Sequence, residues 1–220
     1  GSVYTRRELK KIAQICLKYN LLIIADEIYE KLIYDGQKHI SIASLSPEVK
    51  NITVVINGVS KAYAMTGWRL GYAAGPGDII KLASRIQSHT TSNVNSMTQK
   101  AVVAALNQDE GSVERMRKEF EKRRDYLYST LINIPHIKCH KPQGAFYALP
   151  YVGYYLRHNL RRVRNTVTLC EYLLENYNIA LVPGSAFGIE NYVRFSYANS
   201  MDNIKTGLER FRQGLQSLIG

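Results

Sequence analysis

Hydrophobic and polar residues follow helix-like and strand-like spacings in turn along the first half of the chain. Thr5-Arg6-Arg7-Glu8 forms a capping box, and the apolar residues at helical spacing after it predict a helix that ends near Asn20. Residues 21–25 are all apolar, as expected of a parallel strand with both faces covered. Similar patterns predict two more strands and two covering helices, over residues 53–57, 70–74, 79–87 and 96–106.

From Gly111 onward the pattern is that of a different kind of domain. A long helix is expected first, with a solvated charged face and an apolar face marked by Val113, Met116, Phe120, Leu127 and Leu131. Strands and helices then alternate, with strands expected over residues 145–149, 179–182 and 192–197 and helices over residues 166–176 and 204–219. We therefore predict an α/β first part, residues 1–110, and an α+β second domain, residues 111–220.

The first part contains fewer strands than a parallel sheet usually needs. A parallel α/β sheet that buries both faces has about five or six strands. The pattern here supplies two parallel strands and one further strand. We expect either that the chain is the carboxyl-terminal part of a longer protein or that other material completes the sheet in trans.

The composition is that of a soluble globular chain. The 220 residues are 45% hydrophobic and 21% charged, and no apolar run approaches the roughly 18 residues that a membrane helix requires. The three cysteines form no C-x-x-C pair, which argues against a disulfide framework. Because the first residues do not resemble a secretion signal either, we expect a cytoplasmic protein that does not enter a membrane.

The net charge of +11 indicates a preference for anions. The basic residues are locally concentrated at one place, formed by Arg157, His158, Arg161, Arg162 and Arg164. No helix-turn-helix, zinc-finger or aromatic RNA-binding motif accompanies them. A solvated loop, or an attractor for small anionic substrates, is therefore expected there in place of a nucleic-acid site.

Reactive side chains stand at the ends of the predicted strands. Asp26-Glu27-Ile28-Tyr29 ends the first strand, and Ser60-Lys61 follows the second. Polar groups at the carboxyl ends of buried strands are typical of a ligand site in an α/β sheet. A lysine amine that loses hydration at such a place becomes a nucleophile toward carbonyl carbons. The simpler alternative is a lysine whose charged head reaches solvent.

A longer motif favours the reactive lysine. The stretch Gly58-Val59-Ser60-Lys61-Ala62-Tyr63-Ala64-Met65-Thr66-Gly67-Trp68-Arg69-Leu70-Gly71 resembles the pyridoxal-phosphate attachment signature of class I and II aminotransferases. Asp26-Glu27-Ile28-Tyr29 is similar to that family's D-E-x-Y segment. Its small-domain motifs are resembled, in the same order, by residues 142–147, 182–188 and 193–198.

The resemblance covers nearly the whole chain but only the latter part of the family's chain, and it is strongest for the bacterial aspartate aminotransferase branch. It implies a fold type I pyridoxal-phosphate-dependent transferase, in which part of a large α/β domain is followed by a small α+β domain. Family enzymes are homodimers with sites near the subunit interface, so the resemblance also implies a dimer.

The resemblance assigns roles to three residues that would contact the cofactor ring or its aldehyde carbon. Lys61 would hold pyridoxal 5'-phosphate as a Schiff base and then move the substrate's α-proton as general base and acid. Asp26 would keep the pyridine nitrogen protonated, where the simpler alternative is a helix cap. Tyr29 would donate a hydrogen bond to the cofactor's ring oxygen, where the alternative is a core tyrosine.

Two arginines and a serine are assigned to anionic groups in the same way. Arg69 would bind the cofactor phosphate, and Ser60 would add a hydroxyl contact. Many family members carry a hydroxyl three residues before the lysine, where this chain has Gly58, so the Ser60 contact is a departure from the family's pattern. Arg194 would clamp the substrate α-carboxylate, and a structural salt bridge is the alternative.

No metal site is expected. His136, Cys139 and His140 lie close together in the sequence, but their uneven spacing and the lack of a fourth ligand fit a surface strand better than a metal centre.

The function implied by the resemblance is transfer of an amino group from an amino acid to a 2-oxo acid, with aspartate and 2-oxoglutarate as the first substrates to consider. Aromatic amino acids and prephenate remain open as substrates. Two other functions also remain open: a pyridoxal-phosphate-dependent lyase on the same fold, and a truncated or homologous protein without catalytic activity.

Overall fold

The computed structural model describes residues 1–108, 111–157 and 163–219. They form two compact units, one of Val3–Arg117 and one of Lys118–Gly220 together with Gly1–Ser2. The amino-terminal pair joins the second unit because the Gly1 carbonyl accepts the backbone N–H groups of Gln143 and Gly144. The units divide inside helix α5 (Ser112–Ile132). The assignment of residues 1–110 and 111–220 to the family's large and small domains stays a prediction.

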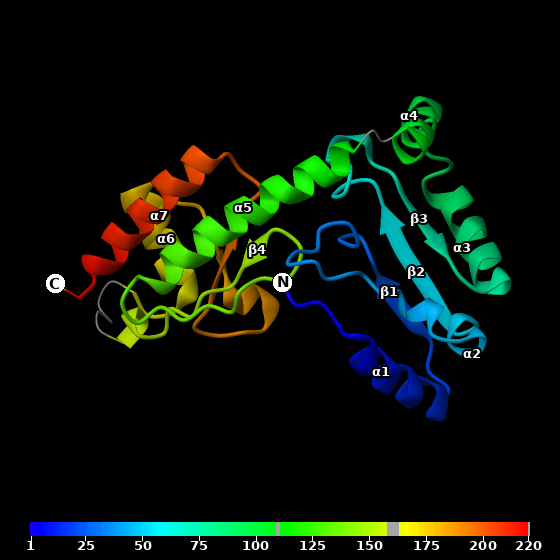
Figure 1. Ribbon diagram of the computed structural model, residues 1–220, viewed down its shortest axis with the longest axis horizontal. Helices are drawn as coiled ribbons and strands as arrows, with labels where there is room; N and C mark the ends of the chain where they lie inside the picture. Colours follow the sequence, from blue (N-terminus) through cyan, green and yellow to red (C-terminus); the bar gives the residue numbers. More distant parts are fainter. Residues whose placement is uncertain (109–110, 158–162, 220) are drawn as a thin grey trace. The chain divides into compact units, whose positions relative to one another are not determined.

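The first unit contains a three-stranded sheet with β2 between β1 and β3 (Figure 1). Strands β1 and β2 run parallel, and β2 and β3 run antiparallel. Its elements are α1 (Arg6–Lys18), β1 (Ile23–Asp26), η1 (Ile42–Ser44), α2 (Pro47–Lys50), β2 (Thr53–Gly58), η2 (Thr66–Trp68), β3 (Gly71–Ala74), α3 (Gly77–Thr90) and α4 (Ser96–Asn107). The predicted helices and strands of this half are confirmed, with ends that shift by a few residues.

The capping box at the start of α1 is confirmed. The Thr5 hydroxyl oxygen accepts the Glu8 N–H at 3.3 Å, and the Glu8 carboxylate accepts the Thr5 N–H at 2.8 Å. These two bonds satisfy backbone donors that a helix start leaves without partners, and so fix where α1 begins.

One face of β1 is covered and the other is exposed. Ile23 and Ala25 point to the covered face, where they pack against the buried side chains of Leu9 and Ala13 from α1. Ile24 points the opposite way and is 77% exposed, because successive side chains of a strand alternate between faces. The prediction of a strand covered on both faces is therefore wrong for the described residues.

Helix α3, which was predicted to cover the sheet, is exposed on its apolar face. It buries none of its residues, and its apolar Leu82 and Ile86 are exposed. The prediction that this helix covers the sheet was based on its helical spacing alone, which shows an amphipathic face but not what packs on that face.

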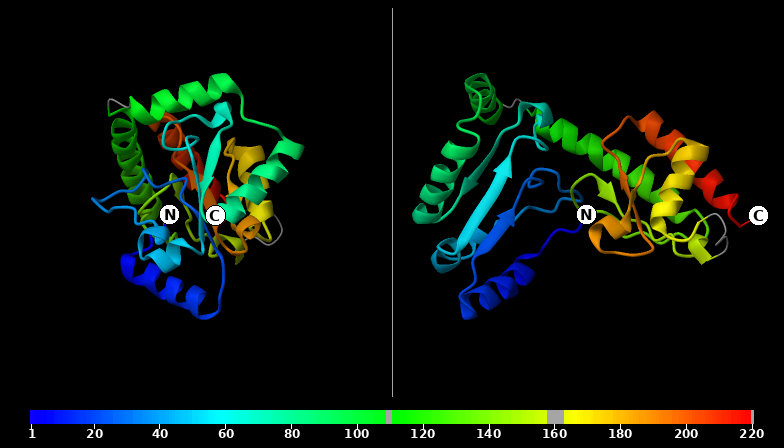
Figure 2. Two further views of the ribbon diagram at one scale, coloured as in Figure 1. Left: turned by 90° about the vertical axis from the view of Figure 1, so that its right-hand side faces the viewer. Right: turned by 180° about the vertical axis from the view of Figure 1, so that it is seen from behind.

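The second unit is an α+β arrangement, as predicted, and Figure 2 shows it from two further sides. Its sheet has β6 between β4 and β5, and both pairings are antiparallel. With α5, the elements are β4 (Tyr147–Ala148), η3 (Tyr155–Arg157), α6 (Thr166–Tyr177), β5 (Val182–Pro183), η4 (Gly184–Phe187), β6 (Val193–Ser196) and α7 (Met201–Gln216). The strands are shorter than predicted.

Helices and strands of the second unit share one hydrophobic core. Its fully buried side chains include Leu127, Leu131, Leu169, Leu173, Phe211 and Leu215. Helices α6 and α7 pack closely at Gly214, where a Cβ atom would lie 2.5 Å from a methyl carbon of Leu173. A larger residue at position 214 would therefore force the two helices apart.

Arg124 is an exception to the prediction that the charged residues of α5 are solvated. Its side chain is 0% exposed. The guanidinium donates a hydrogen bond to the Pro142 carbonyl at 2.9 Å and lies 2.9 Å from an Asp125 carboxylate oxygen. A buried guanidinium needs such partners because an unpaired buried charge is strongly destabilising.

No helix in the described residues has the length and apolar character needed to span a bilayer.

Phe211→Ala should destabilise the second unit strongly. The Phe211 ring is 0% exposed and meets Phe195 edge-on at 4.9 Å between centroids. Truncating a buried phenylalanine typically costs about 3–5 kcal/mol. Urea unfolding followed by circular dichroism measures the loss. Arg212→Ala is the matched control, because it removes an exposed ion pair to Glu209, and exposed ion pairs contribute little to stability. Equal losses in the two variants would contradict this account of the core.

Candidate active site

The turn after β1 places the D-E-x-Y segment. Asp26 ends the strand, and its Oδ1 accepts the Ile28 N–H at 3.2 Å, so the carboxylate helps to form the turn. The Tyr29 carbonyl accepts the Leu32 N–H at 2.8 Å. The Asp26 side chain is exposed and has no basic partner among the described residues. One local hydrogen bond therefore leaves the rest of this carboxylate open to a ligand.

An ion pair that the sequence did not reveal lies beneath the same turn. The Glu27 side chain is only 8% exposed, and one of its oxygens lies 2.9 Å from Nε2 of His39. Glu30 is also near, so that ligand atoms of the three residues lie within 4.8 Å of one another. The set has the donors of a cation site, but the close Glu27–His39 contact forms without an ion. No local spacing links Glu27 to His39, and only the folded turn brings them together.

Lys61 lies just after β2, close to Tyr29. Because β1 and β2 are parallel neighbours with Asp26 opposite Ile56, their carboxyl ends meet at one edge of the sheet. Lys61 is half-buried there, and its Nζ lies 6.0 Å from the centroid of the Tyr29 ring. The predicted nucleophile and the predicted phenol are thus brought together, although they are far apart in the sequence.

Arg69 reaches the same edge by a different route. β3 runs antiparallel to β2 with Gly58 opposite Gly71, so the residues just before β3 lie beside those just after β2. Arg69 has a left-handed backbone, with φ of 56°, and its guanidinium donates to the Thr66 carbonyl at 2.8 Å. A non-glycine residue in that conformation is uncommon and is enriched at functional sites.

Arg69 and Ser60 have few partners of their own. Arg69 is exposed, and no carboxylate in the described residues pairs with it. Ser60 is half-buried, and within the described chain its hydroxyl makes no hydrogen bond. Both groups therefore keep donors that an anionic ligand can accept from.

Arg194 lies in the second unit, on the central strand β6. Its guanidinium carbon is 4.3 Å from the centroid of the Tyr147 ring and 4.4 Å from that of Phe187. Within the ranges that the structure describes, no carboxylate is near enough to form an ion pair with it, so the alternative of a structural salt bridge is not supported. The sequence did not reveal the two aromatic neighbours.

The other candidate residues are explained by local structure. The His136 ring stacks on Tyr154 with 3.6 Å between centroids, and Lys138 forms an isolated bridge to Tyr151 where a surface strand was predicted. Burial raises the pKa of the Cys139 thiol to about 11.

The basic stretch is described only in part. His158, Arg161 and Arg162 lie outside the described residues. Arg157 donates to the Tyr151 hydroxyl at 3.0 Å, and the Arg164 backbone N–H donates to the Thr168 hydroxyl at 2.9 Å. Those contacts are local, and the role of the stretch as a solvated loop or anion attractor stays a prediction.

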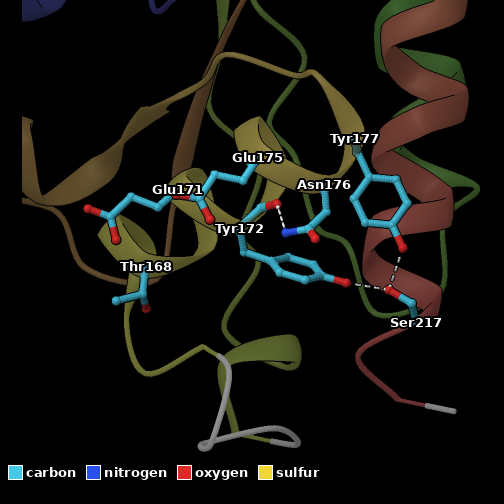
Figure 3. A pocket seen from close by; sticks show the side chains of 7 residues that line it. All are labelled: Thr168, Glu171, Tyr172, Glu175, Asn176, Tyr177 and Ser217. Atoms are coloured by element: carbon cyan, nitrogen blue, oxygen red, sulfur yellow. Dashed lines mark hydrogen bonds between the residues drawn. The ribbon is translucent and has the colours of Figure 1, made fainter.

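A hollow on the surface of α6 and α7 lies in the second unit, apart from the predicted site residues (Figure 3). Its polar lining is bonded to itself, since the Tyr177 hydroxyl donates to the Ser217 hydroxyl oxygen at 2.9 Å and the Tyr172 hydroxyl lies 2.7 Å from the same atom. The Asn176 side chain donates to the Tyr172 carbonyl at 2.9 Å. These bonds satisfy the two tyrosine hydroxyls and the Asn176 amide within the hollow, and they identify no ligand.

Comparison with known proteins is consistent with this arrangement. Residues 1–211 match the family model described as aminotransferase class I and II. The chain belongs to this family. It is 48% identical over 220 residues to an aspartate aminotransferase of Geobacillus stearothermophilus, covering 99% of this chain and 55% of that protein.

Solved structures of family members have the same fold. The aspartate aminotransferase of Rhizobium meliloti has a TM-score of 0.92 and 37% identity, over 97% of this chain and 54% of that one. An aromatic aminotransferase of Pyrococcus horikoshii has a TM-score of 0.91 and 35% identity, over 98% of this chain and 57% of that one. The chain therefore spans about half the length of these relatives. The described residues have the fold of the corresponding part of a fold type I transferase. Aspartate aminotransferases of the family depend on pyridoxal phosphate.

Gly58→Ala should disturb the edge that carries Lys61. A Cβ atom at this position would lie 3.0 Å from the Leu70 carbonyl oxygen and 3.1 Å from the Gly71 Cα atom, so β2 and β3 would have to separate. We expect a loss of about 1–3 kcal/mol in the free energy of unfolding, measured by urea denaturation. Gly77→Ala is the control, because nothing lies within 4 Å of its Cβ position. The account fails if both variants are as stable as the parent chain.

Proposed function

We propose that the protein catalyses pyridoxal-phosphate-dependent transfer of an amino group from an amino acid, first of all aspartate, to a 2-oxo acid, first of all 2-oxoglutarate. The observation that carries this proposal is the position of the Lys61 amine, 6.0 Å from the Tyr29 ring centroid at the carboxyl edge of two parallel strands. The likeness to aspartate aminotransferases supports aspartate as substrate. The aromatic aminotransferase among the similar structures supports aromatic amino acids as the second choice.

The groups at this edge fit the cofactor's chemistry one for one. An amine can attach an aldehyde, a carboxylate can hold a proton on a ring nitrogen, and a phenol can donate to a ring oxygen. These are the groups of Lys61, Asp26 and Tyr29. A guanidinium and a hydroxyl suit a phosphate, and Arg69 and Ser60 have no carboxylate or hydroxyl partner in the described chain. We therefore infer that these five residues hold the cofactor.

The residues then divide the chemistry, and Lys61 has two tasks. When bound, pyridoxal phosphate supplies an electron sink for the charge left on a substrate carbon that loses a proton. Lys61 would hold the cofactor through its aldehyde carbon and would carry the proton from and to the substrate Cα atom. Asp26 keeps the ring nitrogen protonated, since a lasting negative charge beside it favours the charged form. Arg194 binds the substrate α-carboxylate and thereby orients the Cα–H bond.

The Lys61 assignment is tested by trapping. The chain is mixed with pyridoxal phosphate and reduced with borohydride, and the labelled peptide is identified by mass spectrometry. We expect one label per chain, on Lys61. The same peptide should carry no label in the Lys61→Ala variant, because that variant lacks the amine that attaches the aldehyde. Lys31→Ala is the control, since this exposed lysine pairs at 4.0 Å with Glu30 on the same turn. Label scattered over surface lysines would contradict the assignment.

The same proteins distinguish the reaction types. Aspartate and 2-oxoglutarate are supplied together, and the products are separated by chromatography. Oxaloacetate with an equal amount of glutamate is expected of an aminotransferase, whereas elimination products without glutamate would indicate a lyase. Trapping on Lys61 without either set of products would indicate a cofactor-binding chain that lacks catalytic activity.

We also propose that the protein acts in the cytoplasm as a homodimer. The dimer is supported by the likeness to the family, and the cytoplasm by the three cysteines, Cys16, Cys139 and Cys170, none of which is in a disulfide. Light scattering should give twice the chain mass of 25.0 kDa at micromolar concentration. A mass of 25.0 kDa across the concentration range would contradict the dimer.

A further inference from the structure

The Arg194 guanidinium lies over two aromatic rings. Its guanidinium carbon lies at nearly equal distances from them, 4.3 Å from the Tyr147 centroid and 4.4 Å from the Phe187 centroid. Both distances are well within the range in which a ring face attracts a cation. No hydrogen bond or ion pair to this guanidinium is formed by the described residues. Among the described residues, the two rings are therefore the main side-chain contacts of the Arg194 guanidinium.

The sheet register brings Tyr147 to Arg194. Tyr147 on β4 is opposite Ser196 on β6, and Arg194 is two residues before Ser196. Arg194 and Ser196 therefore point to the same face of the sheet. Tyr147 and Arg194 are diagonal cross-strand neighbours on that face, within reach of long and aromatic side chains.

A tight turn brings Phe187 to the same guanidinium. Val182 on β5 is opposite Arg194, and the chain then enters the turn η4, at whose end Phe187 stands. The turn returns to the same strand pair, because the Gly184 N–H donates to the Tyr192 carbonyl at 2.7 Å. A Cβ atom on Gly184 would lie 2.4 Å from the Ile189 carbonyl oxygen and 2.6 Å from that of Tyr192. The turn therefore leaves no room for a side chain at position 184.

Phe187 is not a core residue. Its side chain is 51% exposed, so burial of the ring does not explain its place over Arg194. A guanidinium has all its N–H donors in its own plane and none on its faces. Because a phenylalanine ring carries no carboxylate or carbonyl oxygen, Phe187 lies close to the guanidinium without occupying its N–H donors.

We propose that Phe187 and Tyr147 are positioning residues, which hold the Arg194 guanidinium flat so that its N–H edge meets a carboxylate in a fixed orientation. This inference rests on the proposed function, in which Arg194 binds the substrate carboxylate. A side chain fixed before binding loses less conformational freedom on binding, so the rings strengthen the interaction without touching the ligand. The ligand class is a planar carboxylate, which matches the two parallel donors of the guanidinium edge.

The stacking is tested first, by NMR of arginine side chains in the ¹⁵N-labelled chain. A proton above an aromatic ring face is shifted upfield, so the Arg194 Nε–H signal, assigned with Arg194→Lys, should lie upfield of the other arginine signals. Phe187→Leu should remove a large part of this shift, and Phe187→Tyr should restore it. Tyr126→Leu is the control, because Tyr126 is in the same unit with its ring 6.0 Å from Lys205 Nζ. An unshifted signal in the parent chain would overturn the proposal.

Binding is tested next, by titrating the same variants with succinate, a dicarboxylate that cannot be transaminated. We expect Phe187→Leu to weaken succinate binding by about three- to tenfold, with Phe187→Tyr close to the parent chain. Arg194→Ala should weaken it more. Loss of the NMR shift without loss of affinity would overturn the positioning role.

The two proposals fail in different ways. Succinate affinity that does not change in Arg194→Ala, or no succinate binding by the parent chain, would overturn the carboxylate role of Arg194 and with it the basis of this inference. Weaker binding in Arg194→Ala together with unchanged binding in Phe187→Leu would leave the carboxylate role standing and overturn only the positioning role.

Discussion

Parallel pairing of β1 with β2 is the constraint on which the rest of the first unit depends. With Asp26 opposite Ile56, both strands end at the same edge of the sheet. The turns that follow place the Lys61 Nζ atom 6.0 Å from the centroid of the Tyr29 ring. The antiparallel strand β3 then starts at this edge, because Gly71 is opposite Gly58. Backbone hydrogen bonding between the strands therefore brings four groups that are far apart in the sequence to one edge. They are the amine of Lys61, the carboxylate of Asp26, the phenol of Tyr29 and the guanidinium of Arg69.

Much of this arrangement could be predicted from the sequence because it depends on local patterns. The capping box at Thr5 and the apolar run of β2 fixed elements that the structure contains. The reactive residues at strand ends were enough to predict a ligand site at the carboxyl ends of the strands. The family resemblance then added roles for those residues, which no periodicity could supply.

What could not be predicted depends on packing between distant segments. The exposure of Ile24 follows from the lack of a second layer over β1 in the described chain, and an apolar run does not reveal what covers it. The pairing of Glu27 with His39 and the position of Phe187 over Arg194 both require a turn to fold back on its own strand. Arg124 was predicted to be solvated because its neighbours on α5 are charged, yet its partners come from Asp125 and the distant Pro142.

Four arginines in the described residues show two ways in which a guanidinium is held. Those that support helices are neutralised nearby: Arg123 pairs with Glu119 at 3.0 Å, and Arg212 pairs with Glu209 at 2.7 Å. Arg69 and Arg194 are instead held by groups without a negative charge, a carbonyl oxygen in one case and two rings in the other. Neutral supports fix a guanidinium in place but leave its charge uncompensated. That charge is then available to an anion, which gains the full attraction without first displacing a carboxylate.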